Sequence, residues 1–166
     1  MTDRAAKAAA QWEVEKPDWD TGPMVLFGRL IEASLVLTRD QLGPVYARHG
    51  INRGEFDVLA TLRRSGAPYQ LNPTELYETA MVTSGSMTNR IDRLESAGLV
   101  ERLPNPADRR GLLVQLTQKG RLLIETALVE QMAEQKAALS PLSQAEQAQL
   151  SSLLARLILS ASEPNQ

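Results

Sequence analysis

Residues 84–98 read SGSMTNRIDRLESAG, and residues 99–116 continue as LVERLPNPADRRGLLVQL. In the first stretch apolar residues recur at helical spacing, so that Met87, Ile91 and Leu94 fall on one side of a helix. In the second stretch apolar runs flank a cluster of Pro, Asn, Asp and Gly, which is typical of two strands joined by a turn. The sequence therefore predicts a helix followed directly by a basic hairpin.

Two further helices are predicted immediately before this stretch. Asn52 has the side chain to cap a helix that carries Phe56 and Leu59, and Asn72 can cap a shorter helix that begins at Pro73. Helices in such close succession have the spacing of a helix-turn-helix. With the hairpin behind them, they predict a winged helix-turn-helix, which is a mainly α fold with a small β-hairpin wing.

Long helical segments flank this unit on both sides. Residues 4–15 are rich in strong helix formers, and an apolar stripe at helical spacing then runs over 23–48, with a kink expected at Gly43. On the other side, Thr117 can cap a helix that reaches about residue 139. Ser143, with an acid three residues on, opens a last helix by the capping-box pattern.

The composition narrows the classes of protein to which the chain can belong. Its 166 residues include no Cys and a single His, His49, which excludes a disulfide scaffold, a thiolate nucleophile and a zinc–thiolate site. No Gly-rich phosphate loop, pair of catalytic carboxylates or nucleophile with a base is recognisable. We therefore expect neither an enzyme nor a bound cofactor or metal. His49 follows the end of a predicted helix and is interpreted as a cap or a solvated residue.

The chain has no run of about 18 apolar residues and no apolar signal segment at its start, so we expect a cytoplasmic protein without a membrane span. Its formal net charge is -2 at pH 7, but the charge is unevenly distributed. Residues 84–121 hold seven Arg and Lys against four Asp and Glu, whereas acids outnumber bases beyond residue 122. The basic middle of the chain predicts one face for an anionic partner.

The exposed side of the helix at 84–98 suits entry into the major groove of DNA. Arg can bond guanine bidentately and Asn can bond adenine bidentately, while hydroxyls near a helix start can meet phosphate. Arginines on a slender hairpin tip can reach the minor groove and its negative potential. The candidate DNA contacts are Ser84, Ser86, Thr88, Asn89, Arg93, Arg109 and Arg110. The alternative interpretation of both elements is an ordinary solvated surface.

Taken together, these motifs resemble the MarR family of bacterial winged-helix regulators. The resemblance covers the chain from residue 24 onward and rests on residues 84–94, on GLVER at 98–102, on DRRG at 108–111, and on Leu116-Thr117 and Gly120. It implies a ligand-responsive regulator that binds double-stranded DNA. It also implies a homodimer whose terminal helices interlock and whose two recognition helices read a pseudo-palindromic operator. The half-sites would lie about one helical turn (~34 Å) apart.

The implied dimer gives the long flanking helices a partner against which to bury their apolar sides. We accordingly divide the chain into an N-terminal extension helix and linker at 1–22, a dimerisation helix at 23–50, a winged helix-turn-helix DNA-binding domain at 51–117, and C-terminal dimerisation helices at 118–166. In this arrangement the acidic helices lie away from DNA, so the negative net charge does not oppose DNA binding.

The N-terminal extension is similar to the extra first helix of the urate-responsive branch of this family, the HucR and PecS type. That branch uses a Trp and, four residues later, an Arg on this helix, an Asp on a core helix and an Arg on the recognition helix. Trp12, Asp57 and Arg90 match three of these positions, and Lys16 stands where Arg is expected. The resemblance implies a repressor with a site for urate, a flat anion on which a Trp can stack and which Arg or Lys can neutralise.

Several alternatives stay open from the sequence. Lys is a point charge where Arg offers a planar fork, so a phenolic acid such as salicylate is an alternative effector. Trp19 is an alternative stacking residue, and packing at the dimer interface is an alternative role for Trp12. Asp57 has an alternative helix partner in Arg53, and Arg90 has one in a DNA phosphate. A winged helix that binds another protein is the alternative to DNA binding as a whole.

Overall fold

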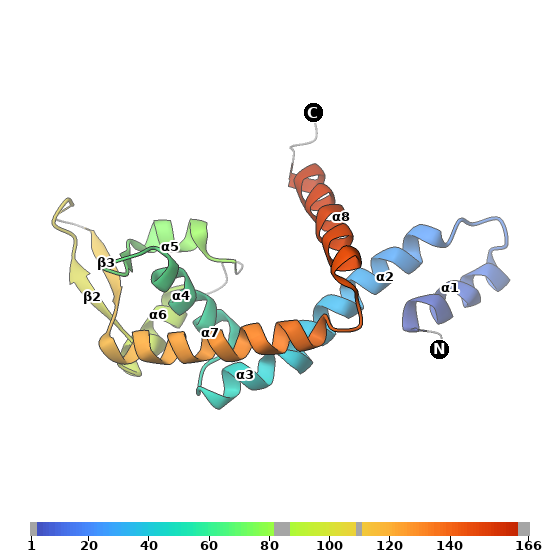
Figure 1. Ribbon diagram of the computed structural model, residues 1–166. Coiled ribbons are helices and arrows are strands. Elements are labelled where there is room, and N and C mark those ends of the chain that lie inside the picture. Colours follow the sequence, from blue (N-terminus) through green and yellow to red (C-terminus); the bar gives the residue numbers. More distant parts are fainter. Residues whose placement is uncertain (1–2, 82–86, 109–110, 163–166) are drawn as a thin grey trace.

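The protein is described here from a computed structural model, which describes residues 3–81, 87–108 and 111–162. Helices dominate this part of the chain, and a small sheet forms the wing (Figure 1). The elements in chain order are α1 (Arg4–Glu15), α2 (Gly22–Leu35), the π-helix η1 (Val36–Gln41), α3 (Gly43–Arg48), α4 (Arg53–Arg64), β1 (Gln70–Leu71), α5 (Pro73–Thr79), α6 (Met87–Ser96), β2 (Val100–Pro104), β3 (Leu112–Leu116), α7 (Gln118–Ala138) and α8 (Gln144–Ser162). The mainly α winged-helix fold is therefore confirmed.

Local capping chemistry starts the helices where the sequence predicts. At α4 the Asn52 side chain accepts the Glu55 N–H at 3.0 Å, and the Glu55 carboxylate accepts the Asn52 N–H at 2.8 Å. Asn72 and Glu75 form the same reciprocal pair at the start of α5. The side chain of Thr117 caps α7. Each cap contributes about 1 kcal/mol by satisfying backbone donors that the helix leaves without a partner.

The wing is an antiparallel sheet in the order β1-β3-β2. β2 pairs with β3 from Val100 opposite Leu116 to Pro104 opposite Leu112, which confirms the predicted hairpin. β1 was not predicted from the sequence, because this strand is only Gln70–Leu71 and too short to show an alternating pattern.

The core lies inside the winged-helix unit, where α4, α6, α7 and the sheet meet. Its fully buried side chains include Val58, Leu59 and Leu62 of α4. Gly120 lets the first turn of α7 approach the start of β2, since a Cβ on Gly120 would lie 1.9 Å from the Leu99 carbonyl oxygen. This close approach fixes the wing against the long helix that leaves the domain.

The segment predicted as one helix over 23–48 is divided into α2, η1 and α3. In η1 the Leu42 N–H bonds the Leu37 carbonyl five residues back, and the Thr38 hydroxyl bonds the Ser34 carbonyl. These bonds widen the helix before Pro44, which lies in the first turn of α3. The predicted bend at 43–44 is thus spread over a π-helical turn, because the Pro removes a donor from the α-helical ladder.

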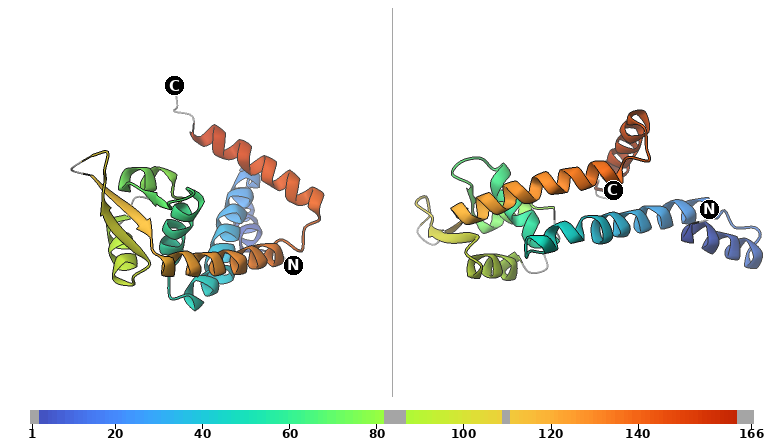
Figure 2. Two further views of the ribbon diagram at one scale, coloured as in Figure 1. Left: turned by 60° about the vertical axis from the view of Figure 1, so that its left-hand side comes forward. Right: turned by 60° about the horizontal axis from the view of Figure 1, so that its bottom comes forward.

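The outer helices extend away from the core as two long arms (Figure 2). α1 folds back along α2, and α8 leaves the end of α7 in another direction. α2 has no buried residue, and large apolar side chains on both arms are exposed: Met24, Phe27, Ile31, Leu35, Leu153, Leu157 and Ile158. Within the residues that the structure describes, no helix combines the length and the apolar character needed to cross a membrane.

Candidate nucleic-acid interface

α6 occupies the position of a recognition helix and presents two chemically different sides. Its apolar side, from Met87 to Leu94, is buried against the core. The predicted DNA contacts Thr88, Asn89 and Arg93 lie on the other side and are exposed. The helical spacing of the sequence therefore separated the packing residues from the candidate DNA-contacting residues correctly.

Four of the predicted DNA contacts lie outside the described residues. Ser84 and Ser86 precede the described start of α6, and Arg109 and Arg110 come between β2 and β3 in the sequence. These four residues remain predictions from the sequence.

Arg93 of α6 forms an ion pair with a residue of α4. Its Nε lies 3.2 Å from an oxygen of Glu55, whose side chain is only 7% exposed, while that of Arg93 is 72% exposed. Sequence reasoning did not single out Glu55, although the Asn-x-x-Glu pattern that begins at Asn52 marks it as a capping residue. The structure adds that this capping carboxylate also contacts a candidate DNA-binding arginine.

A second arginine, Arg102 of β2, reaches across to the acidic residues of α6. Its guanidinium bonds Asp92 through one nitrogen and Glu95 through another. The hydrogen bond that Arg102 donates to Asp92 and the charge of Glu95 raise the pKa of Arg102, because both favour its charged form. The pairing offsets two carboxylates on a helix that is predicted to approach phosphates, and it ties the wing to α6.

Two side chains of α4 hold the connection between α5 and α6. The Met81 N–H donates to a carboxylate oxygen of Asp57 at 2.7 Å, and Arg64 bonds the Thr79 carbonyl. Asp57 therefore binds the backbone of Met81, two residues beyond the end of α5, which is a more specific contact than a surface pair with Arg53. A change at Asp57 removes this contact with the chain between α5 and α6.

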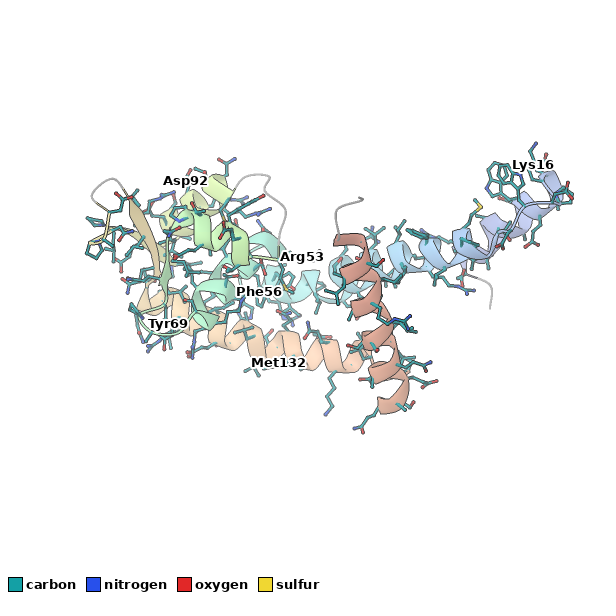
Figure 3. The ribbon with its side chains drawn as sticks, turned by 90° about the horizontal axis from the view of Figure 1, so that it is seen from above. Lys16, Arg53, Phe56, Tyr69, Asp92 and Met132 are labelled. Atoms are coloured by element: carbon teal, nitrogen blue, oxygen red, sulfur yellow. The ribbon has the colours of Figure 1, made fainter. Side chains whose placement is uncertain are left out.

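The structure places two of the four predicted ligand-binding residues on the packed helices α4 and α6. Arg90 of α6 lies against Gly54, where an added Cβ would be 2.5 Å from the Arg90 Nε, and Asp57 lies one turn further along α4. Trp12 and Lys16 belong to the far end of the N-terminal arm, remote from α4 and α6 in the same chain (Figure 3).

The end of this arm carries its own aromatic pair. The rings of Trp12 and Trp19 are stacked with centroids 5.5 Å apart, and the side chains are 41% and 51% exposed. Lys16 lies at the C-cap of α1 between them in sequence. α1 is tied to the start of α2, because the hydroxyl of Thr21, the N-cap residue of α2, donates a 2.8 Å hydrogen bond to Glu13. The arm therefore presents an exposed aromatic surface beside a cation.

The chain is similar in sequence and in fold to known proteins. Residues 51–112 match the MarR family. The transcriptional regulator PecS of Dickeya dadantii is 40% identical over 147 residues, which cover 89% of this chain and 88% of that protein. The chain belongs to the MarR family. Among solved structures, a variant of Escherichia coli MarR complexed with operator DNA has a TM-score of 0.70 and 30% identity, covering 88% of this chain and 96% of that one. Sco5413, a MarR family regulator of Streptomyces coelicolor, has a TM-score of 0.72 and 26% identity, covering 87% and 98%.

Membership of the MarR family settles the coarse function. The chain is a DNA-binding transcriptional regulator of the MarR and PecS type and not an enzyme, as the sequence predicted. The similarity to PecS spans nearly nine-tenths of the chain and therefore reaches well beyond the winged helix. This extent fits the PecS and HucR branch that the extra first helix indicated.

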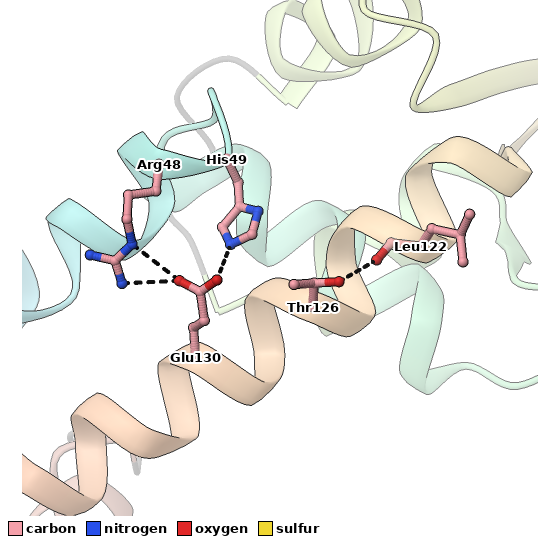
Figure 4. Close-up of polar contacts among 5 residues, drawn as sticks. All are labelled: Arg48, His49, Leu122, Thr126 and Glu130. Carbon is pink, nitrogen blue, oxygen red and sulfur yellow. Dashed lines mark hydrogen bonds and ion pairs between the residues drawn. The ribbon is translucent and has the colours of Figure 1, made fainter.

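In this MarR-family chain, the junction between the arm and the winged helix is held by one carboxylate (Figure 4). Glu130 of α7 accepts bonds from Arg48 at 3.0 Å and lies 3.2 Å from His49 Nε2. The Arg48 hydrogen bond and the nearby His49 ring hold the pKa of Glu130 below its ordinary value. His49 is at the C-cap of α3, as predicted, but its largely buried ring contacts Glu130 and is not solvated.

Proposed function

We propose that the chain acts as a homodimeric repressor that leaves a pseudo-palindromic operator when a small aromatic anion such as urate binds. The observation that carries the ligand-dependent part is the position of Asp57 and Arg90. Asp57 holds the Met81 amide just ahead of the recognition helix, and Arg90 of that helix rests on Gly54. An anion that attracts Arg90 and repels Asp57 acts on both contacts at once.

The homodimer is supported by the apolar sides of the arms. Leu26 and Leu30 of α2 and Leu150, Leu153 and Leu157 of α8 line one groove between the two arms. A monomeric protein rarely exposes a contiguous patch of five leucines to solvent. Burial of each leucine side chain stabilises a contact by about 1.5–3 kcal/mol. The arm of a second copy is complementary to this groove, because it carries the same apolar sides.

The dimer also offers a way to complete the ligand site. In one chain α1, which carries Trp12 and is capped by Lys16, is remote from α4 and α6, which carry Asp57 and Arg90. We propose that the arm of the partner chain brings its aromatic surface to the winged helix, so that each site takes residues from both copies. A stacked indole then contacts the flat face of the anion while Arg90 and Lys16 neutralise its charge.

Release from DNA requires a difference in affinity between two states. The effector must bind the DNA-incompetent arrangement of α6 more tightly than the DNA-bound one, because a ligand shifts an equilibrium only by its differential affinity. Contact with Arg90 supplies such a difference, since the position of this side chain is coupled to the orientation of the recognition helix.

The test is fluorescence anisotropy of a labelled duplex from upstream of the protein's own gene, titrated first with salt and then with urate. We expect tight binding that weakens steeply with salt, and displacement of the chain by urate. Asp57→Ala and Arg90→Ala should blunt the displacement by urate, while Glu101→Ala, an exposed acid on β2 away from α4, serves as a matched control and should leave it unchanged. A normal urate response in both site variants would show that the site is misplaced.

The same titration separates the alternative functions. Displacement by salicylate but not by urate would identify the phenolic acid as the effector class, which Lys16 in place of an Arg leaves open. Binding that is insensitive to salt would contradict DNA recognition through phosphates and would favour a protein-binding winged helix.

A further inference from the structure

We propose that Glu55 is a positioning residue that aims Arg93 at a base edge, so that the helix cap of α4 also determines the sequence preference of α6. The proposal rests on the candidate role of Arg93 in DNA recognition. It concerns a residue of α4 that belongs neither to the recognition helix nor to the wing.

The two oxygens of Glu55 have different partners. One oxygen accepts the Asn52 N–H at 2.8 Å and closes the capping box, while the other lies 3.2 Å from the Arg93 Nε. The cap fixes the carboxylate relative to the backbone of α4, and the side chain is almost fully buried. The anion that Arg93 meets is therefore a fixed point of the domain and not a mobile surface group.

The contact leaves the outer end of Arg93 exposed. The carboxylate takes the Nε side of the guanidinium, and the side chain remains 72% exposed beside Asn89, one turn earlier on the same helix. An arginine that reads guanine uses two N–H groups of its planar fork, so its plane must be correctly oriented. The ion pair at Nε, where the Arg93 nitrogen lies 3.2 Å from the Glu55 oxygen, favours one orientation before DNA binds.

A second contact joins α6 to the first turn of α4, which also carries Glu55. Arg90, three residues before Arg93, packs against Gly54, where an added Cβ would lie 2.5 Å from the Arg90 Nε and displace the guanidinium. Adjacent residues Gly54 and Glu55 thus meet two arginines that are neighbours on one helix face. The first turn of α4 sets both the distance and the direction of this part of α6.

Pre-organisation should appear in specificity more than in affinity. Binding normally has an entropic cost, because a flexible side chain must be immobilised. Holding Arg93 in advance in the orientation that contacts the base avoids this cost. The gain in affinity is made only on a duplex that offers the base contact. Neutralising Glu55 also removes a negative charge near DNA, which strengthens binding to every duplex alike. The ratio of operator to non-operator affinity separates the two effects.

The chain contains a matched control for this experiment. Glu75 forms the same capping box with Asn72, with distances of 2.9 Å in both directions. Among the residues that the structure describes, Glu75 is in no ion pair, in contrast to Glu55. Glutamine preserves both capping boxes, because its side-chain oxygen accepts the same N–H. Glu55→Gln and Glu75→Gln therefore differ in the loss of the contact with Arg93.

The experiment measures dissociation constants of the full chain for its operator duplex and for a duplex of shuffled sequence, at one salt concentration. We expect Arg93→Ala to lower the affinity ratio by roughly ten-fold or more. Glu55→Gln should lower it by roughly three- to ten-fold, and Glu75→Gln should leave it unchanged. The double variant Glu55→Gln/Arg93→Ala should match Arg93→Ala alone, because the two residues act through one contact.

An unchanged ratio in Glu55→Gln or in Arg93→Ala would overturn the proposal. So would a double variant in which the two losses multiply, since independent losses mean that Glu55 does not act through Arg93. Any of these results would overturn only the roles assigned to Glu55 and Arg93, because the unaltered chain would still bind its operator. Failure of the unaltered chain to bind any duplex in a salt-dependent manner would instead contradict the proposed regulatory function together with this inference.

Discussion

The winged-helix unit and the helical arms differ in how completely a single chain buries them. In the winged helix, Leu59 and Leu62 are fully buried and the recognition helix is anchored by its apolar side. In the arms, Phe27 is 67% exposed and Ile158 is 64% exposed, although both lie in well-formed helices. The winged-helix unit has a hydrophobic core of its own. The arms carry large apolar side chains that remain exposed within one chain.

This difference indicates a division of labour between folding and assembly. A unit with its own core can hold α6 in position within one chain. In the proposed homodimer, the exposed leucines of the arms are buried against a second copy, and the arms set the distance between two recognition helices. DNA affinity should therefore depend on the arms even though no arm residue is expected to touch a base.

The largest effect is expected from breaking the arms. Leu153→Glu with Leu157→Glu places charges in the groove between α2 and α8, which should give monomers and weaken operator binding by about 10²- to 10⁴-fold, because the two half-sites are no longer linked. Sedimentation and anisotropy measure both quantities. As a control, Ala148→Glu with Ser152→Glu puts the same charges on the opposite side of α8, and a dimer with normal affinity is expected. A dimeric groove variant would refute the assignment of this surface.

Breaking the core should act on stability and not on assembly. Ile124→Ala should cost about 2–5 kcal/mol, because Ile124 of α7 is fully buried and its loss leaves a cavity. Leu122→Ala, two residues away with its side chain 56% exposed, should cost about 0.5 kcal/mol or less. Denaturant unfolding of the two variants makes the comparison. Equal losses of stability would mean that the winged helix is not independently packed at α7.

A smaller effect is expected at the wing. Arg109→Ala should weaken binding to every duplex by a similar factor and reduce the steepness of the salt dependence by about one unit, as for the loss of one phosphate contact. Salt titrations with operator and shuffled duplexes test this. A loss confined to the operator would show that Arg109 reads sequence and does not act through charge alone.

The smallest effect is expected at the junction between the two regions. Arg48 and His49 hold the pKa of Glu130 below its ordinary value, so the contact stabilises the folded chain above that ordinary value and is lost as the pH falls through the lowered pKa. Glu130→Gln should therefore be less stable than the unaltered chain at neutral pH, and the difference should shrink as the pH falls below about 4.5. Unfolding curves at several pH values measure it. A difference independent of pH would exclude the ionic contribution.

The sequence predicted the features that depend on local chemistry. Asn52, Asn72 and Thr117 cap helices because their side chains satisfy nearby backbone donors, and the apolar period of 87–94 identified the buried side of α6. A residue pattern read along the chain contains this information directly.

The contacts that the sequence did not predict join residues far apart in the chain. Glu55 and Arg93 are separated by 38 positions, and Arg48 and Glu130 by 82. Their pairing depends on how the helices pack, and charged residues on a sequence have many possible partners. For the same reason the four candidate ligand residues could be named from a resemblance, while the distance of α1 from α4 and α6 within one chain became visible only in the fold.

The most direct test of the account is the stoichiometry of the complex between the unaltered chain and its operator, measured by sedimentation across a salt series. We expect two chains on each operator, with protected half-sites about one helical turn apart and an affinity that falls steeply with salt. A single chain that saturates the operator with full affinity would contradict the dimer, and with it the role assigned to the arms.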